Sequence, residues 1–460
     1  MPRDRSPRRS PPCGGAALGG ALRRAADVVL AAVARLLLRV FFREVEVIGA
    51  DRIPRDRPLL LVANHVNSLV DPILILGFLG VRPRFLAKST LWSHPVVAPL
   101  LVVSGALPVY RGQDGGGNVD RNFQTFARCR DHLAAGGTIA LFPEGTSHNQ
   151  PHGLPLKTGA ARIAIEAEEA HGPLGTRIVP VGITYEDKDR FRSRVLVHVG
   201  EPIDPSAGSP PGAAGAVRRL TARIAAGLET VELSFASWGE ARLVDQALAL
   251  ALPLGEPSGA ALSRLSSLRR DAVDRYRRLL ASDPDRAARL AAALARSGPD
   301  PGALGHGAAP ARSRPSLARR TLLAVPALVG TVLNGLPYRI PGWVAEGLTR
   351  TPDEPATYKL LAALIVFPLM WSLEVAAAAV VTGWRGALAV AVAAPLSGYA
   401  ALLYRDDARA SREDHQRRRA FAAEAASKEL MEERSRLRGE LIDLVEPGES
   451  NARPAEPVPG

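Results

Sequence analysis

Residues 58–72 read PLLLVANHVNSLVDP. The opening PLLLV is a short apolar run, which is typical of a buried strand when turn residues follow it. His65 and Asp71 come just after this run, the first near the strand end and the second on the turn that follows. The stretch therefore predicts a buried strand that carries a histidine and a carboxylate to one edge of a sheet.

Further short apolar runs alternate with helical patterns from Val45 to about Ile203. Helical spacing is clearest over residues 118–135 and 159–170. Alternation of this kind predicts an α/β layer fold with a mostly buried sheet flanked by helices, which we assign to residues 44–205. The other runs are EVEVIG, RFLAK, ALPVYR, TIALFPEG, RIVPVGITY and VLVHVG.

The pairing of His65 with Asp71 predicts a general base and its orienting partner. If Asp71 holds one ring nitrogen, the other is free to take a proton from a substrate hydroxyl. The alternative is purely structural, because a histidine and an aspartate near a helix start also cap and pack. Other segments have to decide between these interpretations.

Three cations are candidates for binding phosphate. Arg111 ends a strand in GALPVYRG and offers two donors to a phosphate group. Lys157 in LPLKTGA precedes a helix N-terminus, which favours a phosphate or the phosphopantetheine arm of an acyl donor. Lys88 ends RFLAK and adds a third positive charge.

The run TIALFPEGTSH leads from a buried strand into a sharp turn with Glu144, Gly145 and Thr146. Loops at strand ends are where open α/β sheets bind ligands. We therefore expect this turn to bind acceptor hydroxyls or to order Arg111.

These segments, in this order, resemble the glycerolipid acyltransferase family, with its Asn-His…Asp, Gly…Arg, Phe-Pro-Glu-Gly and Val-Pro-Val motifs. The resemblance covers roughly residues 45–205. It implies His65 as general base, Asp71 as its partner and Arg111 as phosphate ligand. It implies an acceptor-binding loop at residues 144–146, and neither a metal nor another cofactor.

Two departures from the family pattern stand out. Five residues separate His65 from Asp71 where four are usual, and Ser147 replaces the usual arginine after Glu-Gly-Thr. Both resemble the branch that contains fungal glycerol-3-phosphate/dihydroxyacetone-phosphate acyltransferases and bacterial relatives.

The N-terminal part is expected to be a disordered basic tail over 1–20 and an uncleaved helix over 21–43. Apolar residues recur at helical spacing in the helix, with Arg35 and Arg39 on another face. This pattern favours a helix in the membrane interface, and the alternative is a core helix of the next domain.

The C-terminal half predicts a helical region and linker over 206–316 and a membrane region over 317–410. Residues 360–382 and 387–404 are each long enough to cross a bilayer and form a hairpin around the turn GWRG. Arginines follow in a charged tail over 411–460, which the positive-inside tendency places in the cytoplasm with the catalytic domain.

Other functions find little support. The formal net charge is +12, yet no basic patch is interleaved with stacking aromatics, so nucleic acid is not expected as a partner. His148 and His152 have metal-ligand spacing only on a helix, which Pro151 and Gly153 would break.

The combined prediction is a membrane-bound O-acyltransferase at the cytoplasmic membrane. It would move a fatty acyl group from acyl-CoA or acyl carrier protein to a hydroxyl of 1-acylglycerol-3-phosphate. The alternatives are glycerol-3-phosphate or dihydroxyacetone phosphate as acceptor, or a non-catalytic lipid-binding scaffold that keeps the fold.

Overall fold

The structure is a computed structural model that describes residues 14–110, 121–207, 215–251, 261–297 and 317–425, together with Gly439. Seven strands form one mixed sheet in the order β1-β7-β6-β2-β5-β3-β4. The expected α/β fold with a mostly buried sheet is confirmed. The strands are β1 (Glu44–Ile48), β2 (Leu59–Ala63), β3 (Pro83–Lys88), β4 (Leu107–Val109), β5 (Thr138–Leu141), β6 (Arg177–Tyr185) and β7 (Arg194–Val199).

Parallel pairing brings the carboxyl ends of the central strands to one edge. β2 pairs in parallel with β5 and β6, and β5 pairs in parallel with β3. The antiparallel pair is β6 with β7. The loops that follow β2, β3 and β5, and the end of β6, therefore meet at the same edge, where ligands bind in folds of this type.

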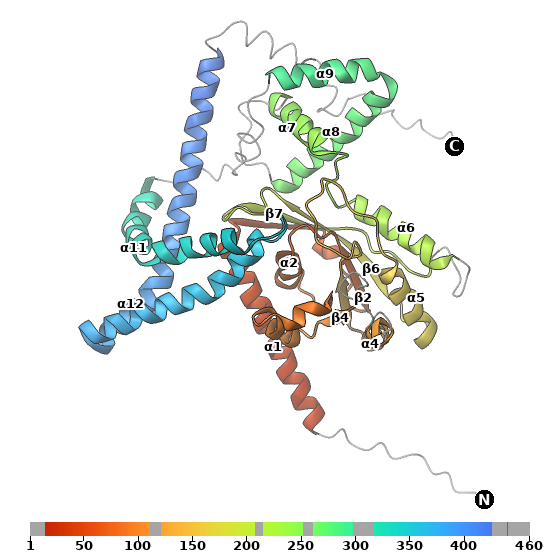
Figure 1. Cartoon of the computed structure of the whole chain (residues 1–460), viewed down its shortest axis with the longest axis horizontal. Coiled ribbons are helices and arrows are strands. Elements are labelled where there is room, and N and C mark those ends of the chain that lie inside the picture. Colours follow the sequence, from red (N-terminus) through yellow and green to blue (C-terminus); the bar gives the residue numbers. More distant parts are fainter. Residues whose placement is uncertain are drawn as a thin grey trace, which may run out of the picture.

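The central strand β2 is buried on both faces, as its continuous apolar run predicts. Leu59 and Leu61 face a core shared with α1 (Gly14–Phe41) and α2 (Val70–Phe78). Leu60 and Val62 face the opposite core, shared with α4 (Arg121–Ala134), α5 (Gly159–His171) and α6 (Ala216–Glu229). Figure 1 shows the sheet between these two helical layers.

A separate helical unit follows the sheet domain. Its helices α7 (Trp238–Ala251), α8 (Leu262–Ser282) and α9 (Pro284–Ser297) share their own apolar core. α8 contacts β7 and β1, so this unit lies against one border of the sheet. Shorter helices are η1 (Ala50–Arg52), η2 (Ser89–Ser93) and α3 (Val97–Val103).

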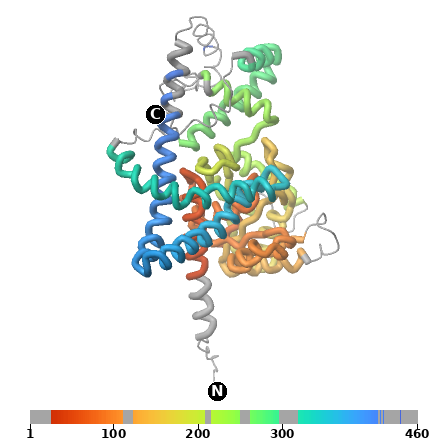
Figure 2. Tube along the Cα trace, turned by 60° about the vertical axis from the view of Figure 1, so that its left-hand side comes forward, coloured from red at the N-terminus to blue at the C-terminus, as the bar shows by residue number. Residues whose placement is uncertain are grey.

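Two helices, over residues 318–348 and 355–412, are long and apolar enough to cross a membrane. They belong to α11 (Leu317–Leu348) and α12 (Pro355–Ala425). α12 breaks at Gly383, where φ is 75° and ψ is −171°, at the start of the expected GWRG turn. Both views show α11 packed with α12, and Figure 2 shows α12 running beside α1.

The N-terminal boundary differs from the expectation. α1 already begins at Gly14, inside the tail expected to be disordered over 1–20, because the helix-favouring Ala16, Ala17 and Leu18 extend it. The rest of that tail, residues 298–316 at the end of the expected helical region and linker, and most of the charged tail beyond residue 425 lie outside the described residues.

Candidate active site

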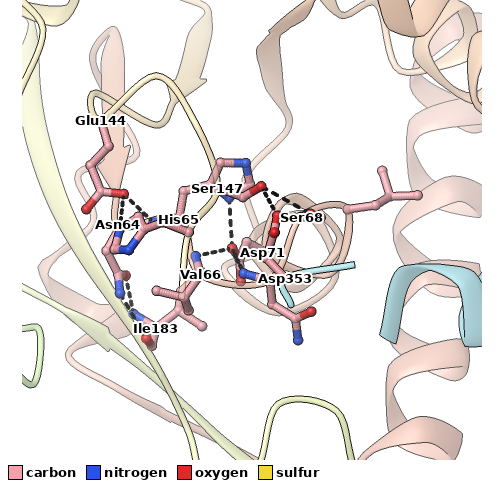
Figure 3. A network of polar contacts seen from close by, with 12 residues as sticks. Asn64, His65, Val66, Ser68, Asp71, Glu144, Ser147, Ile183 and Asp353 are labelled. Carbon is pink, nitrogen blue, oxygen red and sulfur yellow. Dashed lines mark hydrogen bonds and ion pairs between the residues drawn. The ribbon is translucent and has the colours of Figure 1, made fainter. Parts of the chain in front are cut away.

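His65 and Asp71 meet as the sequence predicts. His65 follows the end of β2, and Asp71 lies in the first turn of α2, with 2.8 Å between His65 Nδ1 and Asp71 Oδ2 (Figure 3). A carboxylate oxygen accepts, so Nδ1 carries the hydrogen and Nε2 keeps its lone pair. The Asp71 side chain is fully buried, whereas the His65 side chain is 17% exposed. Nε2 is thus the basic atom available to a substrate.

Asp71 is held by donors on both of its oxygens. Oδ2 also accepts the backbone N–H groups of Val66 (2.9 Å) and Asn67 (2.8 Å), and Oδ1 accepts the hydroxyl of Tyr185 at 2.5 Å. Burial raises the pKa of Tyr185 well above its ordinary value, and the neighbouring negative charge of Asp71 raises it further. Tyr185 therefore stays a neutral donor to a buried anion.

Tyr185 was not among the predicted site residues. Its position at the end of the strand RIVPVGITY is the one sequence signal that could have found it. Asn64 joins the same strand to β2: it donates to the carbonyl of Ile183 at 3.1 Å and accepts the Ile183 N–H at 2.7 Å. The Asn-His motif thus fixes β2 against β6, and Tyr185 reaches Asp71 from there.

The His65 ring and backbone are both fixed by the loop after β5. The ring stacks on Phe142, with ring centroids 4.0 Å apart and an interplanar angle of 14°. The His65 N–H donates to Glu144 Oε2 at 3.1 Å, and its carbonyl accepts the His148 N–H at 3.1 Å. The His65 imidazole therefore has little rotational freedom.

Glu144 is buried, with its acceptor sites facing protein donors. Besides the N–H of His65, it bonds to His148 Nε2 at 3.0 Å and accepts the Leu154 N–H at 3.3 Å. The Gln150 N–H donates to His148 Nδ1, so His148 is protonated on Nε2 and donates to Glu144. These contacts join Glu144 to the His65 backbone, whereas the family resemblance implies an acceptor-binding role for the same carboxylate.

The other residues of this loop lie at its surface. Gly145 has a φ of 77°, which favours glycine, and the Lys157 side chain passes so close that an added Cβ would lie 2.6 Å from Nζ. The Lys157 N–H donates to the carbonyl of Pro143 at 2.8 Å. Thr146 is exposed, and its hydroxyl donates to the carbonyl of Ser147 at 3.2 Å. The structure thus brings Gly145, Thr146 and Lys157 together.

The structure gives less information on the two other predicted cations, Lys88 and Arg111. Lys88 is the last residue of β3, at the same sheet edge as the loops after β2 and β5. Arg111 lies outside the described residues, so its phosphate-binding role stays a prediction.

The two departures from the family pattern meet at one carboxylate that the sequence did not predict. The longer turn between His65 and Asp71 contains Ser68, which has a positive φ of 34°. Its hydroxyl lies 3.1 Å from that of Ser147, and both donate to Asp353 Oδ2 (Figure 3). Asp353 lies between α11 and α12, far along the chain, so neither motif nor spacing could reveal this contact.

Comparisons with known proteins identify the sheet domain. Residues 44–184 match the family model described as acyltransferase. The chain is 28% identical over 252 residues to an uncharacterized acyltransferase of Schizosaccharomyces pombe, covering 36% of this chain and 37% of that one. It is 24% identical over 288 residues to glycerol-3-phosphate O-acyltransferase 1 of Saccharomyces cerevisiae, covering 43% and 38%. A 1-acyl-sn-glycerol-3-phosphate acyltransferase of Chlamydomonas reinhardtii is 31% identical over 143 residues, covering 30% and 38%.

The match is confined to part of each protein. The chain spans less than two fifths of the length of these three relatives. Among solved structures, the 1-acyl-sn-glycerophosphate acyltransferase of Thermotoga maritima has a TM-score of 0.35 and 26% identity, covering 45% of this chain and 80% of that one. The family predicted from the motifs is confirmed by the family model and these relatives. Residues 44–184 therefore form an acyltransferase-family domain, and glycerol-3-phosphate and 1-acylglycerol-3-phosphate acyltransferases are among the proteins that the chain resembles.

Proposed function

We propose that this protein is a membrane-associated O-acyltransferase that moves a fatty acyl group from a thioester donor to a hydroxyl of a glycerol-phosphate lipid precursor. One observation carries the proposal: His65 has its Nδ1 bound to the buried Asp71, and its Nε2, at the ligand-binding edge of the sheet, has no hydrogen-bond partner among the described residues. This arrangement suits a base that takes a proton from a substrate hydroxyl.

In the proposed reaction, His65 Nε2 takes the proton of the acceptor hydroxyl as its oxygen attacks the thioester carbonyl. A C–O bond forms, the C–S bond breaks, and the proton passes from His65 to the leaving thiolate. The fixed negative charge of Asp71 stabilises the imidazolium between these steps. Four hydrogen-bond donors hold the Asp71 carboxylate in place.

The first candidate acceptor is 1-acylglycerol-3-phosphate. Such a lysolipid has its acyl chain in the membrane, and the two apolar helices α11 and α12 meet the active-site loops at Asp353. Apolar side chains exposed along these helices favour contact with lipid. They include Leu322, Val325, Leu328, Val332, Val380, Val381 and Leu388.

The second candidate acceptor is glycerol-3-phosphate or dihydroxyacetone phosphate. The extra residue before Asp71 and Ser147 in place of arginine favour it, since both departures resemble the fungal branch. A segment of 82 residues is also 42% identical to glycerol-3-phosphate O-acyltransferase 2 of Saccharomyces cerevisiae, although it covers only 11% of that protein. Both candidates present a phosphate, for which Lys88, Arg111 and Lys157 are the proposed ligands.

We propose acyl-CoA or acyl carrier protein as the acyl donor. We also propose that the catalytic domain faces the cytoplasm. Arg405, Arg409 and Arg412 follow the apolar part of α12, and basic residues that flank membrane segments favour the cytoplasmic side.

The test is acyl transfer by the full-length protein in membranes, with both donors and all three acceptors offered and the products resolved by mass. His65→Ala should abolish transfer while expression and detergent extraction stay normal. His171→Ala, at the end of α5, is the matched control and should keep activity. Full activity of His65→Ala would remove His65 as the base. A wild-type protein that transfers no acyl group would favour the lipid-binding scaffold instead.

A further inference from the structure

The connection between α11 and α12 lies directly on the active-site loops. Asp353, in this connection, is buried and accepts the hydroxyl hydrogen of Ser68 at 2.7 Å and that of Ser147 through the same oxygen (Figure 3). Ser68 belongs to the turn between His65 and Asp71. Ser147 belongs to the loop whose Glu144 binds the His65 backbone. A single carboxylate thus joins the two loops that fix the base.

Neighbouring residues extend the contact on both sides. The Leu69 N–H donates to Thr357 Oγ1 at 3.1 Å. Lys188 Nζ donates to the carbonyls of Pro352 at 2.6 Å and Val66 at 3.2 Å. Lys359 Nζ donates to the carbonyl of Asp189 at 2.6 Å. The start of α12 is therefore bound to the turn after β2 and to the loop after β6.

The turn after β2 is held partly from outside. Leu69, the N-cap residue of α2, makes no side-chain cap to the helix, and the Val70 N–H bonds to the Asn67 carbonyl at 2.9 Å within the turn. Serine is a common cap, but the Ser68 hydroxyl faces Asp353 instead, and Thr357 accepts the Leu69 N–H. The positive φ of Ser68 is an uncommon conformation for a residue other than glycine. Such a conformation persists where the surroundings hold it.

Asp353 fits this role because it stays ionised. Burial opposes its charge, but the hydrogen bonds from Ser147 and Ser68 outweigh burial and hold the pKa of Asp353 below its usual value. An ionised carboxylate forms stronger hydrogen bonds with two hydroxyl groups than a neutral acceptor would.

We propose that Asp353 is a positioning residue of the active site, and that the α11–α12 connection is required to hold His65 in its reactive geometry. Asp353 acts through Ser68 and Ser147 and does not touch the reacting atoms. The inference rests on the proposed acyl transfer. It assigns the C-terminal helices a part in catalysis in addition to membrane anchoring.

The competing explanation is that these contacts only attach α12 to the sheet domain. A second contact between α12 and the sheet domain allows an experiment to distinguish the two explanations. Arg192, in the loop before β7, pairs with Asp406 of α12 and donates to the carbonyls of Arg39 and Val40 in α1. Asp406→Asn therefore weakens the attachment of the same helix without touching the turn that holds His65.

The experiment compares Asp353→Ala, Asp353→Asn and Asp406→Asn in the full-length protein, measuring kcat, both KM values and the unfolding midpoint. Asp353→Ala should lower kcat about tenfold or more, because small displacements of a catalytic group are costly, with both KM values within about twofold. Asp353→Asn keeps an acceptor oxygen and should lose less activity. Asp406→Asn should keep its kcat even where its unfolding midpoint falls.

A double-mutant cycle then tests whether Asp353 acts through the serines. Adding Asp353→Ala to the Ser68→Ala, Ser147→Ala variant should lower kcat by no more than about twofold further, because the shared interaction is already absent. Unchanged kcat in a folded Asp353→Ala, equal losses in Asp406→Asn, or fully additive losses would each contradict the proposal.

Two outcomes need separate treatment. If Asp353→Ala does not fold, the Ser68→Ala, Ser147→Ala variant alone tests the proposal. A kcat equal to that of the wild type in this variant contradicts it. Failure of the proposed function looks different, because the wild-type protein itself would then transfer no acyl group.

Discussion

Tyr185 donates its hydroxyl to Asp71 Oδ1 across 2.5 Å, while Oδ2 of the same carboxylate bonds to His65 Nδ1 at 2.8 Å. The end of β6 thereby holds the partner of the proposed base, through a carboxylate with no exposure to solvent. A buried anion depends on each of its donors, because no water replaces a lost hydrogen bond.

Tyr185→Phe should therefore weaken the site without removing it. A hydrogen bond to a charged group contributes about 1.5–3 kcal/mol, so the free energy of unfolding should fall by about 2 kcal/mol and kcat should fall less than in His65→Ala. Thermal unfolding in detergent and acyl-transfer kinetics measure both. Tyr276→Phe, in α8, is the control. Unchanged stability and kcat would show that this hydrogen bond contributes nothing.

Much of the site was predictable because it is local in sequence. His65 and Asp71 flank one turn, and Glu144, Gly145 and Thr146 share another. Parallel pairing of β2 with β5 then brings both turns to one edge, a consequence of the strand and helix alternation. Tyr185 was missed because the sequence does not specify which residue of a buried strand reaches its neighbour's loop.

Asp353 could not have been predicted for a different reason. It lies between two apolar helices, where an acidic residue indicates only that the chain leaves the membrane region. Its importance depends on the docking of those helices, which is a long-range packing result. The local signals were the two departures, an extra residue in one motif and a serine in another, and they pointed to a branch of the family without showing a shared partner.

Glu144→Gln separates positioning from acceptor binding. An amide nitrogen in the place of Oε1 would face the Leu154 N–H, and one in the place of Oε2 would face both the His65 N–H and the His148 N–H. At least one donor therefore loses its acceptor. We expect a loss of about 1–3 kcal/mol in stability and a lower kcat with unchanged acceptor KM. The opposite result, a higher acceptor KM at unchanged stability, would show that Glu144 binds the acceptor directly.

Arg111→Lys tests the proposed phosphate ligand. Lysine keeps the charge but not the two-pronged geometry, so the acceptor KM should rise about tenfold while the donor KM and kcat change little. Arg128→Lys, on an exposed position of α4, is the matched control. An acceptor KM equal to that of the wild type would exclude Arg111 from the phosphate site.

Glu232 gives a prediction for the dependence of stability on pH. It follows α6, and its carboxylate lies against Gly153 in the loop after Glu144 and His148, where an added Cβ would be 2.8 Å from Oε1. Burial raises the pKa of Glu232 to about 7, and the negative charge of Glu144 contributes to the rise. The folded protein therefore binds a proton here that the unfolded chain, with an ordinary carboxyl pKa, has already released at pH 6.

The sign follows from this difference. A raised carboxyl pKa favours the folded state at low pH, and that contribution declines as the pH rises from the unfolded pKa through the folded value of about 7. The decline amounts to about 3 kcal/mol in all and is complete about one pH unit above the folded pKa. Glu232→Gln is always neutral, so it should match the wild type in acid and become the more stable protein at about pH 8. Unfolding midpoints of both proteins between about pH 5 and pH 8 measure this, and two parallel curves would show that Glu232 does not titrate in this range.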